Sequence, residues 1–436
     1  MNYTGDPIGK LYRKLVPSAI GSMLTATVAS LIDTIILSYY LGPVMLSSVS
    51  ICMPIYMILN ALALLIVSGG ATLCATYLGK EDKEESNRYF TVSSACVLLV
   101  GLVLTVIGNI FPKQIITVLG ANETVWQPTL EYARVLMVFM IPLMLYCLML
   151  FFVRFDSDPV LALSATGVCA VTNLVLDILF VGPFGMGAGG AALATCLAYT
   201  LATAVGFIHF FKKKNTLRII RKSISLYRIK RILAAGLPLS FSQFGMAFTT
   251  SVFNVQIMRI GGELYLTVYA IITQLSMSAL AFYEGIAQAA QPILAANYGA
   301  GNSERVKKSL QTGLFLETVF TVGCFLLYVL FVKTISSFFS ITEGELLQIS
   351  MEGIRIFACS IPFTGFNIFA MYYLQSRERI VPSTIISLMN GTILLIISLI
   401  ALTTCFGAKG IWWSWLTAQT LTLLFTVYAM GRENRE

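Results

Sequence analysis

The chain has 436 residues, of which 57% are hydrophobic and only 11% are charged. Soluble globular proteins have about 25% charged residues, and so apolar a chain could not cover a water-facing surface. The composition therefore excludes a soluble enzyme and a disordered protein. It also excludes a nucleic-acid binder, although the net charge of +8 would by itself suit one.

Twelve apolar runs are long enough to cross a membrane, since a spanning helix needs about 20 such residues. In chain order we expect spans over residues 16–40, 46–76, 90–111, 132–153, 160–181, 188–211, 232–258, 265–290, 310–332, 354–374, 384–405 and 411–430. We expect no attached soluble domain, and no G-x-x-x-x-G-K-[ST] phosphate-binding motif is present. Any transport would therefore draw its energy from an ion gradient or an external partner.

Positive charge indicates the orientation of these spans. Most of the 29 lysines and arginines fall in alternate connections, on the side that also carries both termini. Because basic loops stay in the cytoplasm, we expect a multi-pass protein of the plasma (inner) membrane with both termini cytoplasmic. This placement also explains the net charge without a nucleic-acid partner.

The two halves of the chain resemble each other at an offset of about 220 residues. Pro17 matches Pro238, Asp33 matches Asn254, and both halves keep similar glycine-rich turns. We therefore predict an amino-terminal six-helix lobe over 1–211, a basic cytoplasmic linker over 212–231, and a carboxy-terminal six-helix lobe over 232–436. The linker could be an amphipathic interfacial helix, and we expect a solvated or lipid-facing connection, with a regulatory site as the alternative. Parallel repeats of this kind commonly bind substrate between the halves, near the middle of the membrane.

Acidic side chains within the spans are the strongest functional candidates, because a charge at the bilayer centre costs about 2.5–3.5 kcal/mol even on lenient scales. Four acids cannot be placed in loops: Asp33, Asp177, Glu284 and Glu317. Glu317 has few polar neighbours along the sequence, which favours a structural role for it.

Asp33 and Asp177 are predicted to lie at similar depths in the outer half of the membrane. Asn173 lies one helical turn before Asp177, and Thr195 on the next span can reach a similar depth. Two carboxylates, an amide and a hydroxyl suit Na⁺, a hard cation, or protons shared between coupled carboxyls. We predict a cation- or proton-coupling site at Asp33, Asn173, Asp177 and Thr195; the alternative is a hydrogen-bonded structural carboxylate.

A second polar set lies in the carboxy-terminal half. Glu284 is followed by Gln288 one turn later and Gln291 two turns later, and Asn254 occupies the repeat position of Asp33. Polar stripes within spans normally face the bundle interior or a cavity. We therefore predict that Glu284, Gln288, Gln291 and Asn254 line a substrate cavity.

Nothing in the sequence points to a cofactor. The nine cysteines fall in predicted spans and are expected to act as small packing residues. His209, the single histidine, lies near the end of a span and is interpreted as an interfacial anchor.

Three motifs resemble the multidrug and toxic compound extrusion (MATE) family. They are SLIDTIILSYYLG, then NLVLDILFVG followed by GAGGAALAT, and finally GIAQAAQPILAANYGAGN. The resemblance extends over essentially the whole chain. It implies an all-α fold of twelve helices in two pseudo-symmetric six-helix bundles around a central cavity.

Within that family, Asp33, Asn173, Asp177 and Thr195 match the amino-terminal cation or proton site of the DinF-like branch. The acids that the NorM-like branch carries on its seventh and tenth spans are missing here, and Glu284 is the candidate to replace them. The resemblance implies a secondary active multidrug efflux transporter, not an enzyme. It would export amphipathic organic cations in antiport with H⁺ or Na⁺ by alternating access, most simply as a monomer. The alternative within the same superfamily is a flippase for lipid-linked oligosaccharides or peptidoglycan precursors, although no arginine or lysine is predicted at mid-cavity to hold an anionic substrate.

Overall fold

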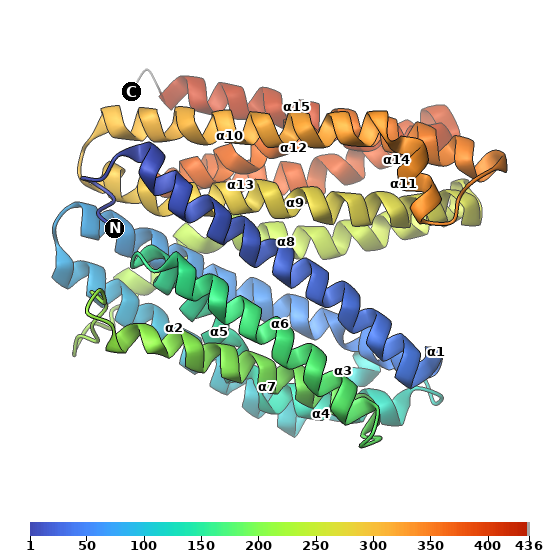
Figure 1. Cartoon of the computed structure of the whole chain (residues 1–436), viewed down its shortest axis with the longest axis horizontal. Helices are drawn as coiled ribbons and strands as arrows, with labels where there is room; N and C mark the ends of the chain where they lie inside the picture. The colour runs from blue at the N-terminus through green and yellow to red at the C-terminus, as the bar shows by residue number, and fades with distance from the viewer. Residues whose placement is uncertain (434–436) are drawn as a thin grey trace. The chain divides into compact units, whose positions relative to one another are not determined.

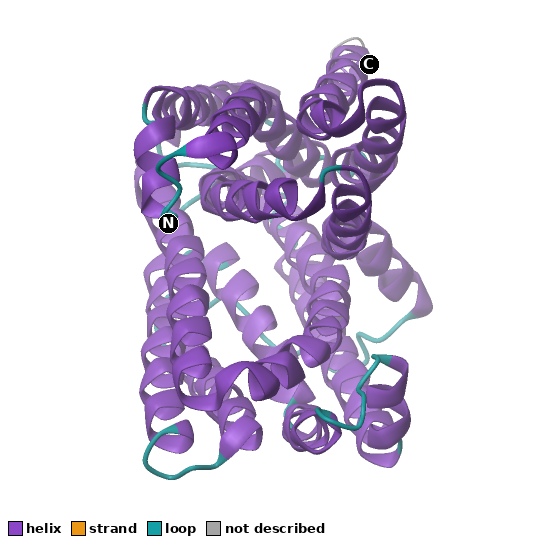
Figure 2. Cartoon of the chain, turned by 90° about the vertical axis from the view of Figure 1, so that its right-hand side faces the viewer, coloured by secondary structure: helices purple, strands orange, loops and turns teal. Residues whose placement is uncertain are grey.

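Every element of regular secondary structure in the described part of the chain is a helix (Figure 2). The computed structural model describes the backbone of residues 1–433, and their side chains except those of 43, 44, 46, 247 and 433. The helices of the first half are α1 (Ile8–Gly79), α2 (Lys83–Ile110), α3 (Pro112–Val118), α4 (Trp126–Val138), α5 (Met140–Phe155), α6 (Pro159–Val181), α7 (Gly187–Phe207) and the short η1 (Ile208–Phe211). Those of the second half are α8 (Leu226–Ile260), α9 (Gly262–Gly299), α10 (Ser303–Leu330), α11 (Val332–Phe338), α12 (Gly344–Ser376), α13 (Ile380–Leu388), η2 (Met389–Ile393), α14 (Leu394–Phe406), η3 (Gly407–Lys409) and α15 (Gly410–Glu433) (Figure 1).

The chain forms two compact units. The first contains Met1–Gly5 and Pro17–Gly236, and the second contains Asp6–Val16 and Leu237–Glu436. The start of α1 thus folds with the carboxy-terminal lobe, where the Tyr12 hydroxyl donates a 2.8 Å hydrogen bond to the Ser309 carbonyl. The start of α8 folds with the amino-terminal lobe, where Arg231 donates to the Tyr77 hydroxyl at 2.9 Å. The boundaries expected from the sequence, on either side of 212–231, do not include this exchange of two short segments.

The described residues contain twelve helical segments long and apolar enough to cross a membrane, once the stretch Ile380–Arg432 is divided in two, which agrees with the twelve runs in the sequence. α1 crosses twice, because Gly42 takes a left-handed conformation (φ 70°) that breaks the helix between its two crossings. α4 and α5 form one crossing bent by 55°. The apolar stretch Ile380–Arg432 contains two crossings, since α15 runs back alongside α14 after the turn at Gly407 (Figure 1).

Several helices are longer than the bilayer requires. α9 has 38 residues, which at 1.5 Å per residue is about 57 Å, against a hydrocarbon core of about 30 Å. Its buried second half is rich in small residues such as Ala289, Ala290 and Ala295, which let neighbouring helices approach closely.

The predicted repeat is visible in the turns and caps. Asp82 caps α2 by accepting a hydrogen bond from the Glu85 amide, and Asn302 caps α10 in the same way through the Arg305 amide. Left-handed residues also occur in matched pairs, at Gly42 and Gly262, Glu81 and Gly301, Gly120 and Ser340, Ser157 and Glu378, and Gly187 and Gly407. The two lobes are therefore two copies of one chain path.

The bend between α4 and α5 has a local cause. Pro142 lacks an amide hydrogen and cannot donate to the carbonyl of Val138, so a continuous helix loses a hydrogen bond there. The helix breaks at Phe139, three residues before the proline.

The basic linker is not an amphipathic helix. Residues 212–225 form turns and extended backbone, and α8 begins only at Leu226. Hydrogen bonds to the amino-terminal lobe hold the segment open: the Arg218 amide donates to Asn87 Oδ1 at 2.7 Å, and the Ile220 amide donates to Thr91 Oγ1 at 3.0 Å. Side chains of α2 thus satisfy linker amides that a helix would have paired internally.

Two glycines bring the second crossing of α1 against the start of α8 within the amino-terminal lobe. A Cβ added at Gly236 would stand 1.8 Å from the Leu65 carbonyl oxygen, and one at Gly69 would stand 2.0 Å from that of Ile232. Both obstacles are backbone atoms, which cannot rotate away.

We therefore expect Gly236→Ala to destabilise the protein by about 1–3 kcal/mol through overpacking. The midpoint of thermal unfolding in detergent should fall by about 2–4 °C for each kcal/mol lost. Gly167→Ala on α6 is the matched control, because nothing lies within 4 Å of its added Cβ. Equal unfolding midpoints for the two variants would contradict the close packing.

Candidate functional site

The four residues predicted to form a coupling site all lie in the amino-terminal lobe. Asp33 is on α1, Asn173 and Asp177 are on α6, and Thr195 is on α7. Asn173 Nδ2 donates a 3.2 Å hydrogen bond to Thr195 Oγ1, which itself donates to the carbonyl of Ala191 at 3.1 Å. The amide and the hydroxyl are thus in direct contact, as the sequence-based grouping expects.

Asp33 and Asp177 form a carboxyl pair. The two side chains are close enough to share a hydrogen bond, and Asp177 has no exposed surface. Both oxygens of Asp177 and Oδ1 of Asp33 are buried without a hydrogen-bond donor. Two ionised carboxylates in such a position would repel each other, so the pair favours a shared proton or a bound cation.

One neighbour of this pair was not identified from the sequence. Tyr132 on α4 is buried, and its phenol lies near both the Asp33 and the Asp177 carboxyl groups. A tyrosine within an apolar span gives no sequence signal that separates this position from ordinary packing. We name Asp33, Asn173, Asp177, Thr195 and Tyr132 the acid-pair site.

The second predicted set is divided between two environments of the carboxy-terminal lobe. Gln288 and Gln291 on α9 are 4% and 0% exposed, and Gln291 Nε2 donates a 3.0 Å hydrogen bond to Gln375 Oε1 on α12. The Gln291–Gln375 contact ties α9 to α12 inside the lobe. The accessible members of the set are Glu284, which is partly exposed, and Asn254 on α8, which is exposed.

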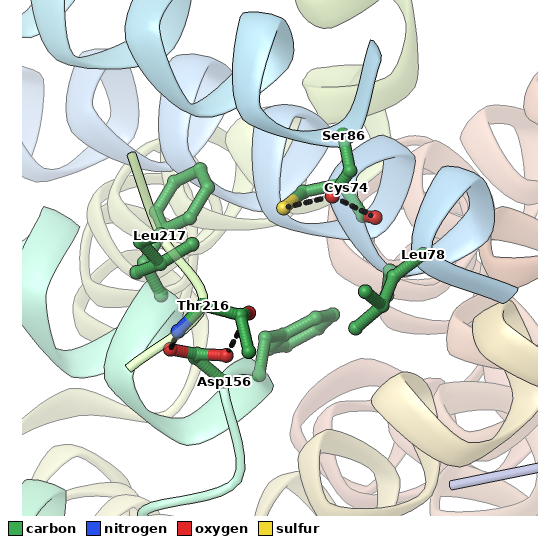
Figure 3. A pocket seen from close by; sticks show the side chains of 9 residues that line it. Cys74, Leu78, Ser86, Asp156, Thr216 and Leu217 are labelled. Atoms are coloured by element: carbon green, nitrogen blue, oxygen red, sulfur yellow. Dashed lines mark hydrogen bonds between the residues drawn. The ribbon is translucent and has the colours of Figure 1, made fainter. Parts of the chain in front are cut away.

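A small cavity opens elsewhere in the amino-terminal lobe, beside Cys74, Ser86, Asp156 and Thr216 (Figure 3). Its free volume is about 10 Å³, whereas sites for drug-sized ligands have about 300–1,000 Å³. It can hold about one water molecule, and it is therefore not a substrate site.

His209 lies beside this cavity, in a buried charged cluster. The ring has no exposed surface; Nε2 lies 2.7 Å from Asp156 Oδ2 and Nδ1 lies 3.3 Å from Asp158 Oδ2. Lys212 Nζ reaches the same Asp158 oxygen at 2.8 Å. The interpretation of His209 as an interfacial anchor misses this environment, because the two aspartates are distant in sequence.

The electrostatics of Asp158 follow from these contacts. Burial by itself would raise the pKa of this carboxyl, but the hydrogen bonds and charges of Lys212 and His209 outweigh burial and leave the pKa below its ordinary value. The cluster joins the end of α5, the start of α6 and the linker through charge-assisted hydrogen bonds.

These features define a polytopic membrane transporter built from two repeated lobes. The MatE family model matches residues 17–179 and 238–401, one match in each lobe. The chain belongs to the MatE family of membrane transporters and is not an enzyme. The double match also confirms the internal repeat.

Named relatives and solved structures agree with this placement. The multidrug export protein MepA of Staphylococcus haemolyticus is 24% identical over 428 residues, covering 95% of this chain and 92% of its own length. A multidrug resistance MATE family transporter of the MOP superfamily, solved in an outward-facing conformation, has a TM-score of 0.91 at 23% identity, covering 99% of this chain and 96% of that one. A MOP superfamily transporter from Pyrococcus furiosus, whose reversed pocket polarity suggests a different function, has a TM-score of 0.89 at 23% identity over 99% of this chain and 96% of that one.

Proposed function

We propose that this protein is a secondary active exporter of amphipathic organic cations, driven by antiport with H⁺ or Na⁺. The observation that carries the proposal is the Asp33–Asp177 pair, in which both Asp177 oxygens and Asp33 Oδ1 are buried without a donor inside an apolar lobe. Intramembrane acids of this kind mark ion pathways by default. The curated relative named above is a multidrug export protein, which supports the same substrate class.

Ion binding would change the charge of the acid-pair site, and this change would alter how α1 packs against α6. With a proton or Na⁺ bound, the mutual repulsion of Asp33 and Asp177 is relieved and α1 packs against α6. Loss of the ion restores the repulsion, which favours separation of the two helices or entry of water. An external ion would thus stabilise one packing of α1, and its release to the cytoplasm would favour another.

Glu284 is the proposed contact for the substrate. It is a partly exposed carboxyl on α9, and a carboxylate in an apolar environment attracts a cation more strongly than it would in water. Asn254 on α8 adds an exposed amide in the same lobe. Gln288 and Gln291 complete the proposed substrate set, in which they would support the exposed members from inside the lobe because both are buried.

The proposed setting is the plasma (inner) membrane with both termini cytoplasmic, as the distribution of lysine and arginine favours. We further propose that the protein works as a monomer, with no cofactor beyond the coupling ion and no nucleic-acid partner. The fold alone does not fix the substrate, since the Pyrococcus furiosus transporter has the same fold and a pocket of reversed polarity.

Efflux of a fluorescent organic cation from proteoliposomes tests the proposal. We expect efflux when an inward gradient of H⁺ or of Na⁺ is imposed, and none when that gradient is collapsed with an ionophore. The effective gradient identifies the coupling ion. Absence of efflux under both gradients, together with gradient-dependent movement of a lipid-linked saccharide, would replace the exporter with the flippase.

A further inference from the structure

The buried face of α10 is unusually polar for a helix inside an apolar lobe. Apart from Val306, its buried positions are polar residues or glycine, namely Ser309, Gly313, Glu317, Thr321 and Tyr328. These positions recur at helical spacing and so share one face. The remaining faces of the helix are largely apolar and exposed.

Glu317 lies at the middle of this face and has no hydrogen-bond partner. Its side chain is 2% exposed, and both carboxyl oxygens are buried without a donor. Across from it, a Cβ added at Gly365 on α12 would stand 2.8 Å from Glu317 Oε1. The hydroxyl of Tyr283 on α9 is likewise buried without a partner, and its ring also contacts the Gly365 position.

The titratable groups facing Glu317 are few and weakly acidic. They are Tyr12 from the start of α1, Tyr283 from α9, and Cys324 from α10 itself. Tyr12 is already engaged, since its hydroxyl donates to Ser309. Within the described part of the lobe no lysine, arginine or histidine pairs with Glu317.

The internal repeat shows that the fold does not require a carboxyl at this position. α2 and α10 have the same length and matching caps, so Glu317 corresponds to Val97, which is fully buried. In the same register Tyr283 corresponds to Ala63, which is also buried. The carboxy-terminal lobe thus carries an acid and a phenol where the amino-terminal lobe is filled by two aliphatic side chains.

We propose that Glu317 is a proton-binding site of the carboxy-terminal lobe, which takes up and releases a proton during transport in addition to the ion held by the Asp33–Asp177 pair. A metal cation would need several oxygen ligands, whereas one carboxylate suffices for a proton. On uptake, a lone pair of the Glu317 carboxylate forms an O–H bond to a proton delivered by hydronium, and water is left. On release the O–H bond breaks and the proton returns to water.

The closed lobe explains how this proton is linked to conformation. The neutral acid is compatible with buried surroundings that offer it no donor, while the carboxylate requires water or a donor such as the Tyr283 hydroxyl. Loss of the proton therefore favours a state in which this face of α10 is hydrated. This role in transport rests on the proposed exporter function; proton binding itself can be measured without transport.

Infrared difference spectroscopy of the purified protein tests the site. Between low and high pH we expect the C=O stretch of a protonated carboxyl to disappear, and we expect Glu317→Gln to lack that component. Glu304→Gln, which removes an exposed acid from the same helix, should keep it. Potentiometric titration should show about one proton fewer per molecule in Glu317→Gln. An unchanged difference spectrum in Glu317→Gln would overturn the proposal.

A second variant keeps the test decisive if Glu317→Gln does not fold. The triple variant Asp33→Asn, Asp177→Asn, Glu284→Gln leaves Glu317 as the one acid within the predicted spans. A carboxyl band that titrates in this variant above the pH range of the exposed acids, which is about 4, would support the proposal. A band that stays protonated at every pH would make Glu317 a structural acid. Either result stands whether or not the triple variant transports, so failure of the exporter hypothesis can be told apart from failure of this one.

Discussion

Asp177→Asn is expected to abolish uphill export while leaving the fold intact. Asparagine has nearly the shape of a protonated aspartate, but it can neither release a proton nor offer a carboxylate to Na⁺. One charge moving through 100 mV supplies about 2.3 kcal/mol, enough for a roughly fifty-fold concentration ratio of a neutral solute. Without a coupling ion, a neutral solute should reach a ratio of about one, and a cationic dye should reach only the distribution that the membrane potential sets for its own charge. Steady-state dye distribution in energised proteoliposomes measures it directly.

The design of this experiment separates coupling from binding. Asp33→Asn should have the same effect as Asp177→Asn, because the two carboxyls act as a pair. Glu123→Gln removes an exposed loop acid from the same lobe and should leave the ratio unchanged. Substrate exchange without a gradient should persist in the aspartate variants if they still bind the dye. An undiminished uphill ratio in Asp177→Asn would refute the coupling role of the pair.

His209→Ala is expected to be the most destabilising substitution in the amino-terminal lobe. Removal of one partner from a buried charged cluster costs about 3–5 kcal/mol, because the remaining charges stay buried. Here Asp156 and Asp158 would lose the imidazole ring that lies between them, at 2.7 and 3.3 Å. The midpoint of thermal unfolding in detergent should fall in His209→Ala. It should hardly change in Lys213→Ala, which removes an exposed neighbouring side chain.

The stability lost in His209→Ala should depend on pH in a definite direction. The pKa of Asp158 is lowered in the folded protein, so its contribution to stability is present above the unfolded pKa of about 3.9 and disappears as the pH falls through the folded value. The difference in unfolding midpoint between wild type and His209→Ala should therefore be full at neutral pH and shrink below about pH 4. A difference that stays at its full size well below pH 4 would contradict the lowered pKa of Asp158.

Hydropathy and repetition were enough to predict most of the fold. Twelve apolar runs are visible without any tertiary information, and the matched positions of Pro17 and Pro238 already indicate two copies of one path. The cause of the Pro142 bend is local, because a proline lacks the amide hydrogen wherever it stands in a helix. The conformation of the linker was not predictable, since it depends on Asn87 and Thr91 of a distant helix.

The acids of the candidate site were predictable, because the sequence alone shows that they lie within apolar spans. Asp33 and Asp177 are conspicuous because an acid within a span is expensive, and the one-turn spacing from Asn173 fixes a shared face. A functional role for Glu317 was not predicted, because the groups around it come from α1, α9 and α12. Its neighbours in the sequence do not reveal those contacts. Tyr132 and Gln375 were missed for a related reason: aromatic and amide residues in helices are usually packing residues.

The exchange of short segments between the lobes has a consequence for biosynthesis. Residues 6–16 leave the ribosome before the rest of their lobe, whose other helices begin at Leu237. The amino-terminal lobe, in turn, is incomplete until Gly236 has been made. Translation proceeds at about 5–20 residues per second, so the nascent chain must hold its first helical turns undocked for many seconds. Neither half of the coding sequence therefore specifies a complete lobe, and a cut at the midpoint of the gene would divide both.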